Sequence, residues 1–552
     1  TPPTTNALHT TLLDISLLVN FRMRYYINDN KDTKHYSLGR RSMGGFPLSL
    51  STIATQLSAI SFVSAPAFVG LKLGGGMKWL TFEFAVPLAM LFIMIFVIPP
   101  LFRSGVVSIY EFVERRFGLS TRLVLSLVFQ VSRALGTGVM VYTIAIILQA
   151  VLDIDFVYTI LIISVITIIY SWQGGMKAVV WGDAIQMIIL FAGLLTCLFY
   201  GWHLWSTHGG AELGFVPERL QVIDFNWGLE EGEEYGFWPM LIGGFFLYVS
   251  YYGCDQTQAQ RMLSAKNEAT IRKLLLANGL IRFPVVLLYC TVGLFIGGLV
   301  TLAPDFLQEI SDMTQKYFPE EYAATGTKAD LMIPIFITRY LPHGFIGLLM
   351  VGILSAAMSS LSSTVNSLSA VSVEDFFNRG EKKLAPRRYM LISKAAVVFW
   401  GVVCMAASFL FGGSKSAVIE IINAIGSVFY GPVLVTFLLA MFSKKVTGAG
   451  MNAGIIVAVG VNLLFSKTMQ QIVGIDLGIH IFWIWLNFTG VLLTLVVAYL
   501  VSWVFPHKGP QRESFEISMP GWDAFKTKEV YILLGFFLLI LLFSYALPTL
   551  YG

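Results

Sequence analysis

The chain has 552 residues, of which 56% are hydrophobic and only 13% are charged. Apolar runs long enough to cross about 30 Å of hydrocarbon recur along the whole length, which excludes a soluble globular protein. The formal net charge of +4 comes from loops rather than from one basic face, so nucleic acid is not an expected partner. The four cysteines lie in apolar segments without paired spacing, which speaks against a disulfide framework or a zinc site.

The apolar segments predict an all-α polytopic membrane protein with about 13 to 14 transmembrane helices. In chain order the expected spans lie near 45–70, 79–102, 121–151, 155–171, 179–205, 236–262, 273–302, 345–372, 388–411, 417–442, 448–466, 478–505 and 528–548. Ahead of them, residues 1–44 are expected to form an incomplete peripheral helix and a basic cytoplasmic loop. The last part of the chain, 443–552, is expected to form peripheral helices.

The charges of the loops predict the orientation. Lys and Arg gather in 21–44, 103–122, 261–273, 379–388, 444–445 and 508–528, whereas the loops at 206–235 and 303–331 are acidic. Because short cytoplasmic loops carry the excess of Lys and Arg, the acidic loops and the C-terminus are expected to lie outside. The expected location is the plasma membrane, as an integral protein of a bacterial inner membrane.

Two spans carry polar interruptions at corresponding places. The first full span has a polar middle from Ser49 to Ser61, and the span that opens at Phe237 has a polar run from Tyr251 to Gln260. If 45–205 and 236–442 each form a unit of five spans, the odd number inverts the second unit relative to the first, with 206–235 as the extracellular loop between them. Broken helices at matching places in two inverted halves indicate the central site of a transporter.

A row of small hydroxyl residues, SAAMSSLSSTVNS at 355–367, follows a wholly apolar stretch. Helical spacing places Ser359, Ser360 and Ser363 on one face, with Ser362 beside it. Such a stripe can offer several neutral oxygens to a small hard cation. The alternative is structural: small residues let helices pack closely, and serine hydroxyls bond to the preceding turn.

Ionisable residues at membrane depth are few, and each has a functional and a structural interpretation. Glu83 can accept hydrogen bonds from a solute or pair structurally. Asp183 lies near the start of a span, where a carboxylate is often a partner of the helix dipole. Arg133 can hold a carboxylate bidentately or pair with a helix C-terminus. Arg282 and Asp255 can pair with headgroups, with loops or with each other.

The positions of the histidines speak against a haem or copper site, and the glycine pattern speaks against nucleotide as the energy source. All seven histidines lie in loops or at the edges of spans, so paired ligands for haem or copper are absent from the expected spans. No G-x-x-x-x-G-K-[ST] motif occurs. An ion gradient, rather than nucleotide, is therefore the expected driving force, and no organic cofactor is expected.

Six motifs in order resemble the sodium:solute symporter family, whose members include bacterial sodium/galactose and sodium/sialic acid symporters. The resemblance covers about 36–505. It is carried by YSLGRRSMGGFPLSLSTIATQLSAISF (36–62), SIYEFVERRFG (108–118), YSWQGGMKAVVWGDAIQ (170–186), DQTQAQRMLSAKN (255–267), SAAMSSLSSTVNS (355–367) and FYGPVLVTFLLAMFSKK (429–445). It implies the LeuT-type inverted five-helix repeat with a site near the membrane midplane.

The resemblance also implies two sodium sites. The first would take backbone carbonyls from a broken helix and from the serine helix, together with two hydroxyls: Ala54, Leu57, Ala356, Ser359 and Ser360. The second, known from sialic acid symporters, would use Asp183, Ser359, Ser362 and Ser363. Na⁺ is accordingly the expected coupling ion.

For the solute, the resemblance implies a set that lies on several core helices: Ser61, Glu83, Tyr248, Tyr251, Asn423 and Arg133. Tyr251 matches the aromatic residue that closes a sugar site on its cytoplasmic side. The lysine of the seventh span in the galactose symporter has no clear counterpart, and Arg282 is out of register with it. Arg133 is the candidate in the branch that carries small anions.

The sequence therefore predicts a sodium-coupled symporter, not an enzyme, that imports a small polar solute by alternating access. Its partners would be the solute and the lipid bilayer, and no obligate protein partner is evident. A sugar or polyol is the main prediction. The alternatives are a small carboxylate, such as a monocarboxylate or a sialic-acid-like solute, and a transporter-like sensor that binds without flux.

Overall fold

The computed structural model describes residues 48–49, 51–52, 58–106, 109–152, 154–173, 176–230, 232–378, 384–412, 414, 416–506 and 521–551. The expected peripheral helix and basic loop of 1–44 lie outside these residues. So do Ala54 and Leu57 of the first sodium site. Within helices, the side chains at 170, 172–186 and 260 also lie outside the description.

Ten helices within the described residues are long and apolar enough to cross a membrane. They are Met77–Arg103 (η2, α5, η3 and α6), α8 Leu119–Leu152, α10 Met176–Thr207, α15 Glu268–Leu302, α19 His343–Ser372 with its extension η5 Val373–Phe377, α20 Pro386–Ser408, α21 Val418–Phe442, α22 Gly448–Phe465, α24 Trp485–Val504 and α25 Lys528–Tyr551. The protein is thus an integral membrane protein. Its orientation in the membrane, the inner-membrane location and the larger count of spans remain predictions.

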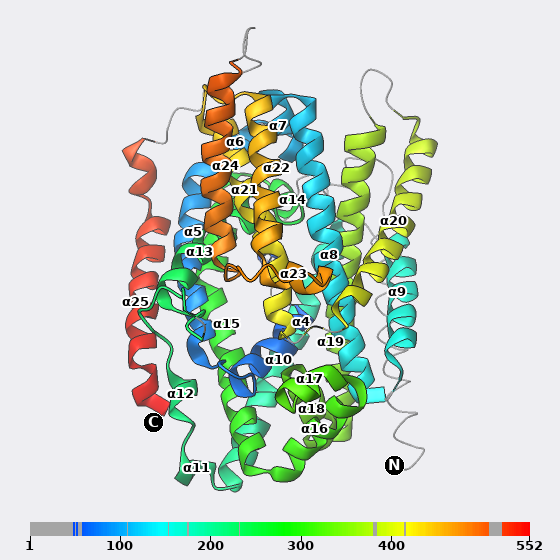
Figure 1. Ribbon diagram of the computed structural model, residues 1–552, viewed down its shortest axis with the longest axis vertical. Helices are drawn as coiled ribbons and strands as arrows, with labels where there is room; N and C mark the ends of the chain where they lie inside the picture. Colours follow the sequence, from blue (N-terminus) through cyan, green and yellow to red (C-terminus); the bar gives the residue numbers. More distant parts are fainter. Residues whose placement is uncertain are drawn as a thin grey trace.

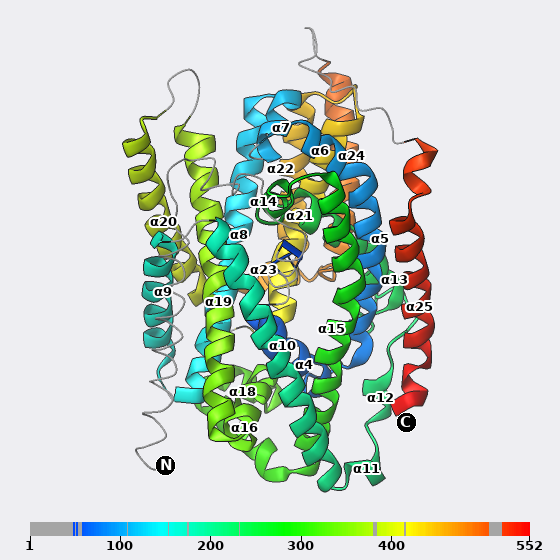
Figure 2. The same ribbon diagram turned by 180° about the vertical axis from the view of Figure 1, so that it is seen from behind.

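Three further apolar helices belong to the bundle: α4 Ala59–Gly70, α9 Phe156–Gln173 and α13 Phe237–Cys254. The long helices run side by side along the long axis of the molecule, with α9 and α20 at one flank and α25 at the other (Figures 1 and 2). We call one end of this bundle the lid end. It carries α16 Pro304–Tyr317, α17 Pro319–Thr325, η4 Ala329–Leu331 and α18 Met332–Tyr340, and the C-terminus lies there too (Figure 1). The opposite end carries α7 Ile109–Phe117.

One of the two predicted helix interruptions is confirmed within the described residues. Helix α13 ends at Cys254, Asp255 has extended backbone (φ −92°, ψ 130°), and α14 Gln256–Leu263 follows. The other interruption falls on 53–57, which are not described, but α4 begins anew at Ala59 beyond it. Ser58 caps this start, because its Oγ accepts a hydrogen bond from the backbone N–H of Ile60 at 3.3 Å.

Helices α4 and α15 cross in unusually close contact. A Cβ atom on Gly297 would lie 2.4 Å from the Cα of Gly70, and one on Gly70 would lie 2.4 Å from the carbonyl oxygen of Gly293. Small residues of this kind let two membrane helices bring their backbones together. The crossing holds α4, which has one end at the central cavity described below, against a long spanning helix.

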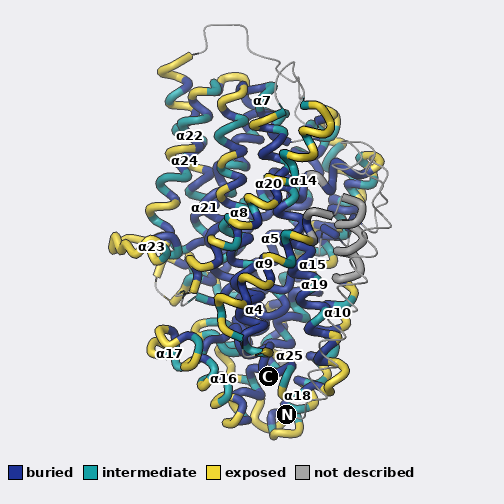
Figure 3. Tube along the Cα trace, turned by 90° about the vertical axis from the view of Figure 1, so that its right-hand side faces the viewer, coloured by how far each residue is buried: buried dark blue, intermediate teal, exposed yellow. Residues whose placement is uncertain are grey.

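The side chains of the inner helices are more buried than those on the outer faces of the bundle. The inner helices are almost wholly buried, whereas the outer faces of α9, α20, α22, α24 and α25 expose large apolar side chains (Figure 3). Exposed apolar bands on spanning helices are typical of surfaces in contact with lipid.

Candidate functional site

A cavity of about 90 Å³ lies in the middle of the bundle, and we call it the central cavity. It collects side chains from α4, η2, α8, α13, α15 and α21. Its lining consists of Ser58, Ile60, Ser61, Ala65, Trp79, Phe82, Glu83, Arg133, Met140, Leu247, Tyr251, Arg282, Val286, Tyr289, Ile419, Ile422, Asn423 and Tyr430.

Glu83 and Arg282 form a buried ion pair in the wall of the central cavity. Arg282 Nε lies 2.5 Å from Glu83 Oε2, and Arg282 Nη2 lies 3.1 Å from Glu83 Oε1. Tyr248 closes a triangle with them, because its hydroxyl donates to Glu83 Oε1 at 3.0 Å and accepts from Arg282 Nη2 at 3.1 Å. Its ring also lies 5.0 Å from the guanidinium carbon. The Glu83 carboxylate is thus engaged within the protein.

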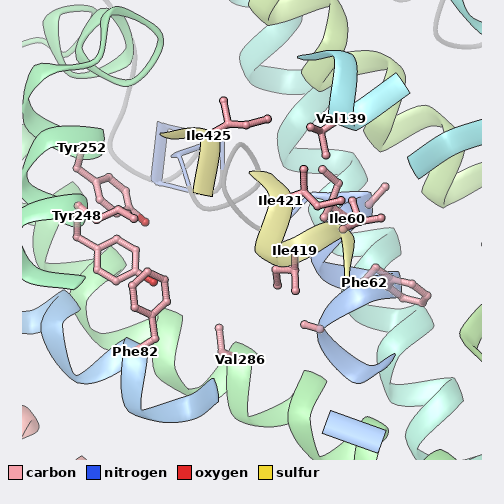
Figure 4. Packing of buried hydrophobic residues seen from close by; sticks show 14 of the residues in the cluster. Ile60, Phe62, Phe82, Val139, Tyr248, Tyr252, Val286, Ile419, Ile421 and Ile425 are labelled. Carbon is pink, nitrogen blue, oxygen red and sulfur yellow. The ribbon is translucent and has the colours of Figure 1, made fainter. Parts of the chain in front are cut away.

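Two buried donors around this ion pair, Arg282 Nη1 and Tyr289 Oη, lack a hydrogen-bond partner among the described residues, whereas the Tyr252 hydroxyl interacts with the Arg282 side chain. Arg282 and Tyr289 both line the cavity. Figure 4 shows Tyr248 and Tyr252 on α13, with Phe82 next to Tyr248, and Ile419 and Ile60 on the other side of the view. A buried polar group without a partner costs about 1–3 kcal/mol. A ligand that accepts hydrogen bonds from these donors would therefore gain the most binding free energy at this place.

A second ion pair lies at the interruption between α13 and α14. Arg133 on α8 donates from Nε and Nη2 to Asp255 Oδ2, at 2.9 and 2.6 Å. Its guanidinium carbon lies 5.2 Å from the ring centre of Tyr251. Asp255 lines a smaller cavity of about 20 Å³, and Tyr430 lines both cavities. Of the alternatives left open for Arg282 and Asp255, pairing with each other is therefore excluded, because Arg282 pairs with Glu83 and Asp255 pairs with Arg133.

The start of α4 lies at the central cavity. Ser58 and Ser61 both line it, together with Ile60 between them. The N-terminus of a helix carries partial positive charge and free backbone N–H groups. This end of α4 therefore favours a negatively charged or hydrogen-bond-accepting ligand.

The structure brings five of the six predicted solute residues to one cavity: Ser61, Glu83, Arg133, Tyr251 and Asn423. The sixth, Tyr248, is fully buried and reaches the site only through Glu83 and Arg282. Asn423 donates its side-chain N–H to the backbone oxygen of Ile419 at 2.7 Å. Its side-chain oxygen and its second N–H therefore remain for a ligand.

Sequence reasoning did not assign Trp79, Tyr289, Tyr430 or Arg282 to the solute site, although all four line the cavity. Arg282 was noticed but was judged out of register. Tyr289 gave one usable signal, which is a hydroxyl in an otherwise apolar segment of the seventh span. Trp79 gave none, because aromatic residues are common near the ends of spans.

The serine stripe is buried in the middle of α19. Ser359 and Ser362 have no exposed surface, and Ser360 and Ser363 are 8% and 5% exposed. Ala356, whose carbonyl belongs to the expected first sodium site, lies one turn earlier on the same helix. The remaining expected ligands of that site, Ala54 and Leu57, are not described. The described members of this set, Ala356, Ser359 and Ser360, are all buried on α19, and the first sodium site stays a prediction.

The second expected sodium site has a cationic neighbour. The buried guanidinium of Arg261 on α14 donates from Nη2 to Ser363 Oγ at 3.3 Å. Asp183 lies on α10, but its side chain is outside the described residues. A sodium ion at Ser363 would lie near a like charge. It would need the carboxylate of Asp183, or a movement of Arg261, to be stable there.

Residues 36–458 match the family described as "Sodium:solute symporter family". The chain belongs to the sodium:solute symporter family. Sodium-coupled monocarboxylate transporter 2 of Danio rerio is 31% identical over 445 residues, which cover 78% of this chain and 66% of that protein. The sodium/iodide cotransporter of Homo sapiens is 28% identical, with coverage of 77% and 64%. The chain therefore spans just under two thirds of these two symporters.

Two further relatives are covered more fully. A putative sodium-dependent multivitamin transporter of Drosophila melanogaster is 26% identical over 90% of this chain and 85% of that protein. Among solved structures, a Na⁺-coupled sialic acid symporter in a substrate-bound outward-open state has a TM-score of 0.73 and 21% identity, over 92% of this chain and 99% of that chain. This likeness shows a shared fold and confirms the predicted all-α, LeuT-type architecture of a symporter.

Proposed function

We propose that this symporter couples sodium entry to the uptake of a small solute that carries a carboxylate. The observation that carries the proposal is the guanidinium of Arg282. It lines the central cavity, and its Nη1 has no hydrogen-bond partner among the described residues, although Nε and Nη2 are engaged. A carboxylate oxygen at this donor would form a charge-assisted hydrogen bond, which is about twice as strong as a neutral one.

The start of α4 supports the same chemistry from another part of the wall. In transporters with broken helices, the N-termini of half-helices point at anionic groups of the solute. The volume also favours a small solute, since about 90 Å³ is less than the roughly 150 Å³ that hold a benzene molecule. Relatives named for monocarboxylates and for sialic acid agree with this class.

A sugar or polyol, the main prediction from the sequence, is less well supported. Two groups expected to bind hydroxyls are already engaged: Glu83 with Arg282 and Tyr248, and the amide N–H of Asn423 with a backbone oxygen. Binding a neutral sugar would leave Arg282 Nη1 with only a neutral partner. The site geometry and the named relatives therefore both favour the carboxylate alternative.

The test is uptake into proteoliposomes, with labelled lactate and butyrate compared with galactose and myo-inositol, with and without an inward sodium gradient. We expect accumulation of a carboxylate only with the gradient. Arg282→Lys keeps a positive partner for Glu83 but removes the Nη1 donor, and should raise the KM for the carboxylate about tenfold, or ~1.4 kcal/mol. Arg103→Lys is the matched control, because Arg103 pairs with Glu268 at an exposed position.

Accumulation of galactose or inositol in place of the carboxylates would overturn the proposed solute class. An unchanged KM in a folded Arg282→Lys protein would remove Arg282 from the solute site. Binding of a labelled carboxylate without any sodium-driven flux would support the sensor alternative instead.

A further inference from the structure

A buried carboxylate joins three separate segments at the lid end. Asp330, on η4 Ala329–Leu331, is 1% exposed. Its Oδ1 accepts a hydrogen bond from Ser64 Oγ of α4 at 2.5 Å, and its Oδ2 accepts one from the backbone N–H of Val418 at 3.2 Å. Ser64 Oγ in turn accepts from the backbone N–H of Ile419 at 3.1 Å. The lid end, α4 and the first turn of α21 are therefore joined in one closed ring of hydrogen bonds.

The first turn of α21 needs an acceptor from outside the helix. The first N–H groups of any helix lack intrahelical acceptors, and the capping residue here, Ala417, has no side-chain oxygen. Asp330 supplies that oxygen from another segment, and its negative charge lies at the positive end of the helix dipole. The contact between the lid end and α21 is thus electrostatic as well as steric.

A second carboxylate ties the same turn of α21 to two other segments. Glu420 lies 3.3 Å from Lys72 Nζ, just after α4, and accepts a hydrogen bond from the hydroxyl of Tyr235, just before α13. Its Oε2 also accepts from the backbone N–H of Ala417 at 2.9 Å. Four parts of the chain that are distant in sequence therefore meet at the start of one helix.

The η4 segment that carries Asp330 is itself firmly anchored. Lys328 is fully buried, and its Nζ lies 2.6 Å from Glu321 Oε2 on α17. Its backbone N–H donates to Thr314 Oγ1 on α16 at 2.9 Å. Its ammonium group also lies 4.9 Å from the ring centre of Phe318. Asp330 is thus attached to α16 and α17, so a movement of α21 away from Asp330 would break the ring rather than carry η4 along.

The ring of hydrogen bonds adjoins the wall of the central cavity. Ile419 belongs to the ring through its backbone N–H, and it lines the cavity. Ala65, the next residue after Ser64, lines the cavity too. For the cavity to open toward the lid end, the start of α21 has to separate from α4. That separation breaks the ring.

We propose that Asp330 is a positioning residue of the transport cycle: it holds α21 against α4, closes the central cavity at the lid end, and is released whenever the cavity opens there. The inference goes beyond the proposed function, because it does not depend on which solute is carried. Without Asp330, the population shifts toward the form that is open at the lid end.

The test measures access to the cavity. Ile422→Cys places a reporter thiol on the cavity wall, while the four native cysteines are buried. A membrane-impermeant thiosulfonate reagent is added to each face of oriented membrane vesicles in turn. Asp330→Asn in the reporter background should raise the labelling rate about tenfold, and from one face only. Ser64→Ala should act in the same direction, and the double variant should add little, because both changes break one ring.

Glu309→Gln is the matched control, since Glu309 is a carboxylate of the lid end that pairs with Arg339 at the surface. It should leave the labelling rate unchanged. The proposal is overturned if Asp330→Asn and Ser64→Ala both fold and label at the rate of the reporter alone, or if Glu309→Gln raises labelling equally. If Asp330→Asn does not fold, the labelling rate of the Ser64→Ala variant alone decides whether the proposal stands. No solute is needed, so this result is separate from the uptake experiment.

Discussion

Arg133 and Asp255 meet at the gap between α13 and α14, where two hydrogen bonds from one guanidinium reach a single carboxylate oxygen. Asp255 also accepts a hydrogen bond at Oδ1 from the backbone N–H of Thr257, at the start of α14. The arginine therefore stabilises a carboxylate that itself caps the second half of a broken helix. The ion pair links α8 to the interruption, and its arginine also lines the central cavity.

We predict that Arg133→Gln lowers the free energy of unfolding by about 3–5 kcal/mol, because it leaves a buried carboxylate without its counter-charge. The double variant Arg133→Gln/Asp255→Asn should recover most of this loss, since both charges are then gone. Thermal unfolding in detergent provides the measurement. A double variant no more stable than Arg133→Gln would show that the pair does not act as a unit.

We predict that Glu83→Gln lowers thermal stability in the absence of solute and enlarges the stabilisation that a carboxylate provides. Without Glu83, the Arg282 guanidinium lacks a counter-charge, and a bound carboxylate can supply one. The measurement is the shift in Tm on addition of lactate, with lactamide as the neutral control. Equal shifts with the acid and with the amide would contradict the assignment of Arg282 as the anion-binding group.

We predict that Ser359→Ala/Ser360→Ala raises the sodium concentration for half-maximal uptake at least about tenfold, ~1.4 kcal/mol. The two hydroxyls are the described side-chain ligands of the expected first sodium site. Ser544→Ala is a suitable control, because this buried hydroxyl on α25 has no hydrogen-bond partner in the described structure. Normal sodium dependence in the double variant would exclude this site.

We predict that Gly297→Ala destabilises the protein by about 1–3 kcal/mol, because an added methyl group overpacks the crossing of α15 with α4. The new Cβ would lie 2.4 Å from backbone atoms of Gly70, which cannot move aside as a side chain can. Gly460→Ala on α22 is the control, since no atom lies within 4 Å of its added Cβ. It should leave stability unchanged or raise it by about 1 kcal/mol. Equal Tm values for the two variants would refute the predicted overpacking.

Much of the fold could be predicted because the hydropathy of a short stretch of sequence is enough to indicate a membrane span. The spans expected at 417–442 and 273–302 correspond to α21 Val418–Phe442 and to most of α15 Glu268–Leu302. The interruption after Tyr251 was also predicted, because a polar run inside an apolar segment is a local signal. The span expected from 478 begins as a helix only at Trp485, since hydropathy alone does not define a helix start.

The lid end could not be predicted in this way. Residues 303–331 were treated as an acidic loop, but they form α16, α17 and η4. Their helices are amphipathic and short, so they give no hydropathy peak. Asp330 was not singled out within this loop, although one sequence signal was present: it stands directly before the apolar run LMIPIFI.

The partners of the buried charges could not be predicted either. The sequence marked Glu83, Arg133, Asp255 and Arg282 as unusual, yet a partner on another helix depends on relative rotation and height, which hydropathy does not contain. The resemblance assigned Glu83 and Arg133 to the solute site, and both line the central cavity. The serine stripe was located on the correct helix, but the neighbouring Arg261 became visible only in three dimensions.

The pairing of both cavity arginines with carboxylates has an electrical consequence. Glu83 balances Arg282, and Asp255 balances Arg133, so these four groups together contribute no net charge to the central cavity. A membrane potential of 100 mV acts on each uncompensated charge that crosses it with about 2.3 kcal/mol. In the proposed transport cycle, these four groups therefore contribute nothing to this electrical free energy when the protein without solute switches from one side of the membrane to the other. For the proposed symport, as far as these groups are concerned, the voltage would act only on the ions and the solute, and the ratio of sodium to carboxylate would set how strongly the potential drives uptake.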